Sequence, residues 1–128
     1  MEKSKIKILI ALVLVIVVGS YLFIFINSHD TMISVTSSST LMNGDFITLV
    51  LKDDYRNVYP GEVIDVKILD DSGWAHYYNA TTDENGQANI MLEGFENGNY
   101  TVHSNFNGTM FLHKSKTVSD LQINDGYN

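Results

Sequence analysis

The sequence contains no cysteine, a single proline and few basic residues, with 8 Lys and Arg against 15 Asp and Glu and a formal net charge of −7. The absence of cysteine excludes disulfides, Cys-ligated zinc sites, iron–sulfur clusters and thiol nucleophiles. The scarcity of basic residues argues against a nucleic-acid partner, because phosphate binding requires clustered Lys and Arg. With 128 residues, 45% of them hydrophobic, the chain has room for one domain, or for one small domain with an appendage.

A run without ionisable residues extends from Ile8 to Ile26. As a helix, these roughly 19 residues would be about 28 Å long, close to the ~30 Å hydrocarbon thickness of a bilayer. Three lysines lie within the first seven residues, and no Lys or Arg follows the run until Lys52. The positive-inside rule therefore predicts a cytoplasmic N-terminus and an extracellular C-terminal domain.

Two other interpretations of the apolar run are a cleaved signal peptide and a buried core helix. The run exceeds the usual signal-peptide length of about 7–15 apolar residues, and no Ala-x-Ala-like cleavage site follows it. The sequence favours an uncleaved signal anchor of a single-pass cell-membrane protein. Residues 1–7 would be a cytoplasmic tail, residues 8–26 would contact the lipid bilayer, and residues 27–42 would be a polar stalk or an edge strand.

Residues 43–124 show the pattern of an all-β domain. Apolar and polar residues alternate over 47–52, 64–68, 88–92 and 100–106. Such alternation buries one face of a strand and exposes the other. Turn-forming residues recur about every 8–13 residues with no amphipathic helix between them. This spacing predicts a β-sandwich or small barrel of about seven antiparallel strands.

One connection is predicted in detail. Asn107-Gly108 is typical of a two-residue hairpin turn, here between strands at 99–106 and 109–118.

In that register His103 faces Leu112 and His113 faces Val102, on opposite faces of the ribbon, so the two histidines would not share a metal. No strained turn presents a nucleophile beside a histidine and a carboxylate, so the sequence does not predict an enzyme.

Two segments carry a family resemblance: Thr82-Asp83-Glu84-Asn85-Gly86-Gln87-Ala88 and, a dozen residues later, Gly98-Asn99-Tyr100-Thr101-Val102. With them, residues 40–120 resemble a single bacterial-type Ig-like repeat. Such repeats are related to invasin and intimin domains and occur in adhesin-like surface proteins of methanogenic archaea. The resemblance implies an all-β Ig-like sandwich, with Tyr100 anchoring the core near the start of a late strand.

Acidic and amide side chains gather in turns expected at one end of this domain. Calcium takes about six to eight oxygen ligands, which such turns can supply. The candidate calcium ligands are Asp53, Asp54, Asp83 and Asn85. The alternative is a set of solvated turn carboxylates, since no Asp-x-Asp-x-Asp-Gly spacing is present.

Two further groups of residues are candidates for surface functions. Trp74 and Tyr78 would form an exposed aromatic site for a partner, unless they fill the core. Asn79, Asn99 and Asn107 begin Asn-x-Thr sequons, which an exported chain could present for glycosylation.

Together these features predict a membrane-anchored cell-surface protein that presents one Ig-like domain. It would act in adhesion or in binding an envelope partner such as a cell-wall polymer or a surface protein. The alternative is a structural spacer or accessory subunit of an envelope complex, with no ligand of its own.

Overall fold

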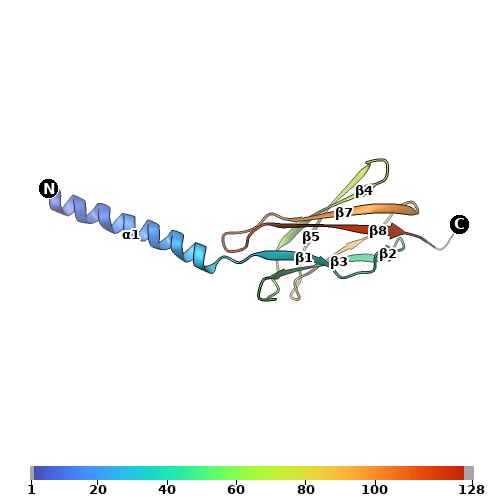
Figure 1. The fold of residues 1–128 in the computed structure, drawn as a ribbon, viewed down its shortest axis with the longest axis horizontal. Coiled ribbons are helices and arrows are strands. Elements are labelled where there is room, and N and C mark those ends of the chain that lie inside the picture. Colours follow the sequence, from blue (N-terminus) through green and yellow to red (C-terminus); the bar gives the residue numbers. More distant parts are fainter. Residues whose placement is uncertain (1, 126–128) are drawn as a thin grey trace.

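Helix α1 (Lys3–Asn27) projects from a β-domain as a rod in the computed structural model, which describes residues 2–125 (Figure 1). None of its residues is buried. A helix that is apolar on all sides, without protein to cover it, suits an apolar surrounding. By length and composition α1 can cross a membrane, and an N-terminal signal sequence would pass the same test.

The β-domain within residues 2–125 contains eight strands in two sheets. The smaller sheet has the order β1-β3-β6 and the larger has the order β2-β8-β7-β4-β5. The predicted sandwich is confirmed, and its neighbouring strands are antiparallel except for the two-residue strand β2, which runs parallel to β8. The strands are β1 (Thr31–Val35), β2 (Thr40–Leu41), β3 (Phe46–Asp53), β4 (Val63–Asp70), β5 (Ala75–Thr81), β6 (Gln87–Met91), β7 (Gly98–Phe106) and β8 (Ser115–Ile123).

The core lies between the two sheets, and the alternating apolar residues fill it. Leu49 and Leu51 of β3 face it from the smaller sheet, and Ile64 and Ile68 of β4 face it from the larger, all with no exposed surface. Because side chains alternate across a strand, polar neighbours such as Thr48 and Asp65 are only partly covered. This burial of apolar area is the main force that holds the two sheets together.

Tyr100 is 8% exposed at the start of β7, as expected, and its hydroxyl donates to the Glu96 carbonyl at 2.6 Å. The ring also contacts Phe95 edge-to-face, with centroids 5.4 Å apart. A tyrosine that bonds back to the backbone a few residues upstream is a device of Ig-like sandwiches. It gives the buried phenol a partner and ties the 92–97 loop to the core.

Residues 27–42 contribute strands to both sheets. Three residues separate the end of α1 from strand β1, which pairs antiparallel with β3 and buries Ile33. Strand β2 then crosses to the larger sheet. The side chains of Asn27 and Ser28 donate to the carbonyls of Phe23 and Ile24, which satisfies acceptors that the helix end would otherwise leave open.

The predicted two-residue turn between β7 and β8 is wrong. The two strands form an antiparallel hairpin, but the connection is residues 107–114, because Phe106 pairs with Ser115. Gly108 keeps the positive φ, +85°, that its turn-like sequence indicated. The chain does not reverse there, because Leu112 is drawn into the core, where it is 5% exposed.

The predicted histidine register changes with the turn. His103 faces Val118, and Val102 faces Ser119, so neither Leu112 nor His113 lies opposite them. His113 instead lies in the loop, where its N–H donates to the carbonyl of His29 at 2.9 Å.

Candidate functional site

The strand directions divide the polar loops between two ends of the sandwich (Figure 1). The helix-proximal end comprises residues 28–30, 54–62, 82–86 and 107–114. The distal end comprises the loops at the other end of the strands together with the adjoining strand ends, which are residues 36–47, 68–76, 90–101 and 120–125. Each predicted site residue can be placed relative to these two ends.

Asp53 is the buried centre of the helix-proximal end, with 1% of its surface exposed. One carboxylate oxygen accepts from the N–H groups of Tyr55 and Asn57, at 2.9 and 2.8 Å. The other accepts from the Asn57 amide at 3.1 Å and from the Tyr59 hydroxyl at 2.6 Å. Asp53 therefore folds the 54–59 loop around itself.

These contacts shift two pKa values in opposite directions. Burial raises the pKa of Asp53, but the hydrogen bonds from Tyr59, Asn57 and Tyr55 outweigh it and lower the pKa to about 2. Burial and the bond to Asp53 raise the pKa of Tyr59 to about 12. The ionised carboxylate and the neutral phenol therefore stabilise each other.

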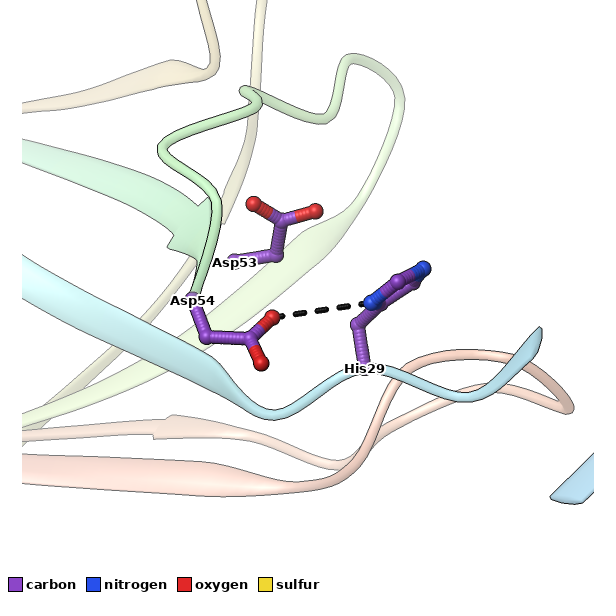
Figure 2. Close-up of side chains that lie close together, drawn as sticks. All are labelled: His29, Asp53 and Asp54. Atoms are coloured by element: carbon purple, nitrogen blue, oxygen red, sulfur yellow. Dashed lines mark ion pairs between the residues drawn. The ribbon is translucent and has the colours of Figure 1, made fainter. Parts of the chain in front are cut away.

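Figure 2 shows His29 and Asp54 beside Asp53. The Nδ1 atom of His29 lies 3.5 Å from a carboxylate oxygen of Asp54, and one ligand atom from each of the three residues lies within 4.8 Å of the others. The spacing could suit a metal ion. Both oxygens of Asp53 already accept two hydrogen bonds, which leaves His29 and Asp54 as the more open ligands.

The other two predicted calcium ligands lie in the β5–β6 turn at the same end. One carboxylate oxygen of Asp83 accepts from the N–H groups of Asn85 and Gln87, at 2.8 and 3.0 Å, which closes the turn. Asp83 is not part of the His29–Asp53–Asp54 group. The structure thus assigns Asp53 and Asp83 a role in shaping loops, and the calcium site stays a prediction.

Trp74 lies on the β4–β5 hairpin at the distal end, with 69% of its surface exposed. Asp70 organises this turn by accepting from the Ser72 hydroxyl at 2.7 Å and from the N–H groups of Ser72 and Trp74 at 2.9 Å. The Ser72 hydroxyl lowers the pKa of Asp70, and the two N–H groups add to this against the opposing effect of partial burial. Trp74 is therefore an exposed aromatic on an ordered turn.

The predicted aromatic pair is divided by the structure. Tyr78 is half-buried and packs against the core, where burial raises its pKa. Tyr77, which the sequence analysis did not single out, is 76% exposed on the outer face of β5. The sequence pattern could have separated the two tyrosines. Tyr78 lies two residues before buried Ala80, so their side chains point to the same face of β5, whereas Tyr77 points to the other face.

The three sequon asparagines lie at separate exposed positions. Asn79 is on β5, Asn99 is on β7, and Asn107 begins the loop after β7. The Asn107 amide donates to Asp65 at 3.1 Å. Glycosylation at these positions stays a prediction.

Charge is distributed unevenly along the domain. Residues 28–128 carry five basic and fourteen acidic side chains, a net charge of −9. The distal segments contain seven acidic residues and no Lys or Arg. Asp71, Asn99 and Asp120 line an open groove of about 440 Å³ there. The distal end thus combines an exposed tryptophan with a negative potential.

No protein-family model matches the sequence, and no match is found among curated proteins. The fold is similar to the crystal structure of a tetra-tandem repeat in the extending region of a large adhesion protein, with a TM-score of 0.52 and 15% sequence identity. The similarity covers 77% of this chain and 25% of that one, so the chain spans about a quarter of its length. At this identity the likeness concerns the fold alone. The Ig-like type and the relation to archaeal surface proteins stay predictions.

Proposed function

We propose that the protein is a single-pass membrane protein whose β-sandwich acts in adhesion or envelope binding outside the cell. The observation that carries this proposal is the pairing of an uncovered apolar helix with a sandwich that resembles a repeat of an adhesion protein. The lysines before the apolar run favour a cytoplasmic N-terminus.

The distal end is the surface that we assign to the partner. It lies at the opposite end of the domain from α1 (Figure 1), so it would face away from the membrane. Exposed tryptophans on ordered supports are favoured at binding hot spots, because little conformational entropy is lost on contact. The seven acidic residues favour a partner with a positively charged surface.

A spacer is the second candidate function. The structural neighbour is described as part of an extending region, which supports a role in holding other parts at a distance. A spacer requires no ligand at the distal end. The two functions therefore differ in whether binding to the envelope depends on Trp74.

The test compares two exposed aromatics in the full chain reconstituted in vesicles. Co-sedimentation with envelopes from the native source measures binding. We expect Trp74→Ala to weaken binding by roughly 30-fold, the equivalent of about 2 kcal/mol at a hot spot. Tyr77→Ala is the matched control, because Tyr77 is similarly exposed but lies on strand β5 opposite Lys67, outside the distal turn that carries Trp74.

Two other results are informative. Unchanged binding in both variants would favour the spacer. Equal loss in both variants would contradict the assignment of the distal end. Added salt should weaken wild-type binding if charge contributes, since salt screens surface charges.

A further inference from the structure

The loop between β7 and β8 carries an apolar tip, Met110 and Phe111, at the helix-proximal end. The next residue, Leu112, is buried in the core, but Met110 is 65% exposed and Phe111 is 37% exposed. A two-residue turn would have closed the hairpin without this excursion. The excursion brings two apolar side chains out of the domain on the side of α1.

The tip lies against the C-terminal half of α1. The rings of Phe111 and Phe23 meet edge-to-face with centroids 6.0 Å apart. Met110 and Phe111 line an apolar groove of about 500 Å³ together with one side of the helix. Figure 1 shows this loop reaching back toward the end of α1. The helix residues that line the groove are Val15, Ile16, Gly19, Ser20, Phe23 and Ile24.

Backbone hydrogen bonds hold the loop in this position. The N–H of His29 donates to the carbonyl of Phe111 at 2.8 Å, and the N–H of His113 donates to the carbonyl of His29 at 2.9 Å. The hydroxyl of Thr31 donates to the carbonyl of His113 at 2.7 Å. The segment that leaves α1 is thus clamped to Phe111 and His113, at the C-terminal side of the tip, so the helix and the tip are placed together.

The helix sets the depth of the tip. Phe23 lies three residues before Ile26, the last residue of the apolar run, which is about 4–5 Å along a helix axis. If α1 spans the bilayer, Phe23 lies within the outer hydrocarbon layer. Phe111, in contact with Phe23, is then held at the same level.

We propose that Met110 and Phe111 insert into the outer leaflet of the bilayer, as a second membrane attachment of the domain. This inference rests on the proposed membrane anchor. The tip continues the apolar surface of α1 without interruption, and lipid acyl chains are the occupant that suits the groove between them.

Three residues near the tip, Tyr55, Arg56 and Lys114, suit the headgroup layer. Tyr55 is 70% exposed at the same end and its ring contacts that of His29, with centroids 5.4 Å apart. Arg56 and Lys114 are also exposed there. Tyrosine and basic side chains are favoured at membrane interfaces. With two attachments, the domain would keep a set orientation on the membrane instead of swinging on a stalk.

Quenching of tryptophan fluorescence by lipids with brominated acyl chains tests the insertion. The chain contains a single tryptophan, Trp74, at the distal end, so the wild type is a control for a residue in water. In a Trp74→Phe background, Met110→Trp reports on the tip and Val13→Trp reports on the middle of α1. Each full chain is reconstituted in phosphatidylcholine vesicles with and without bromine.

We expect severalfold quenching in the Met110→Trp and Val13→Trp variants and almost none in the wild type. Quenching of Val13→Trp without quenching of Met110→Trp would overturn the insertion and leave the anchor standing. Absence of quenching in both variants would overturn the anchor and the insertion with it. Met110 is mostly exposed, so the substitution should not disturb the core, and circular dichroism verifies the β-domain.

Discussion

Buried Asp53 and half-buried Tyr59 form an acid–phenol pair in which each group depends on the charge state of the other. The hydroxyl of Tyr59 donates to Asp53 at 2.6 Å, and the loop between them adds three further donors. The fold therefore needs an ionised carboxylate and a protonated phenol at the same time. This requirement limits the pH range over which the helix-proximal end stays ordered.

We predict that the stabilising effect of this pair is lost at both extremes of pH. The pKa of Asp53 is lowered from 3.8 to about 2, so its contribution is complete above pH 3.8 and declines as the pH falls toward 2. The pKa of Tyr59 is raised from 10.0 to about 12, so its contribution is complete below pH 10 and declines as the pH rises toward 12.

Thermal unfolding of the full chain in detergent, followed by circular dichroism, measures both effects against Tyr59→Phe. Because it has no phenol to ionise, Tyr59→Phe should lose less stability than the wild type as the pH rises from 10 to 12. Its acid decline should be smaller and should end at a higher pH, because Asp53 has lost a donor that lowers its pKa in the folded state. Identical pH profiles for the two proteins would show that the pair does not control stability.

Among the elements, the β5–β6 turn connects the larger sheet to the smaller one and packs against the 54–62 loop. Gly86 has a φ of +72° and accepts a hydrogen bond from the N–H of Leu51 at 3.0 Å. A Cβ at this position would lie 2.7 Å from the Cβ of Val58. The turn therefore requires glycine both for its backbone conformation and for space.

Gly86→Ala and Gly61→Ala separate these two requirements. Gly61 has a similar φ of +74°, but a Cβ there would meet nothing within 4 Å. We expect Gly61→Ala to cost about 1–2 kcal/mol of unfolding free energy from backbone strain. Gly86→Ala should cost a further ~1–3 kcal/mol because it also overpacks the turn. Urea denaturation measures both, and equal costs would mean that the neighbouring loop yields without strain.

At the scale of the whole molecule, the short connection between α1 and β1 sets how far the domain can reach. Only three residues separate the helix from the first strand, and hydrogen bonds to the 107–114 loop engage them. The domain would therefore lie next to the membrane, with its distal end as the surface open to a partner. A single domain in this arrangement suits contact at short range.

Protease treatment of intact cells tests this orientation. We expect external protease to remove the bulk of the chain and to leave a short hydrophobic fragment that contains α1. A cytoplasmic protein serves as the control for cell integrity. Survival of the C-terminal domain in intact cells, with digestion only after lysis, would show that the orientation is inverted.

The sequence by itself determined the apolar helix and the buried faces of the clearly alternating strands, because those features are local. The apolar run at 8–26 predicted a helix, and alternation at residues such as Ile47 and Ile64 predicted which faces enter the core. The same alternation distinguishes Tyr78 from Tyr77. It also placed Asp53 and Asp83 at one end of the domain, since successive strands run in opposite directions.

The tertiary structure decided the contacts between segments far apart in the chain. Nothing near Asn107-Gly108 indicated that the hairpin would open into a loop. Leu112 enters the core there, and its neighbours Phe111 and His113 pair with His29, more than 80 residues away. Local patterns specify which face of a strand is buried, but the partner of each segment is selected only when the whole core packs.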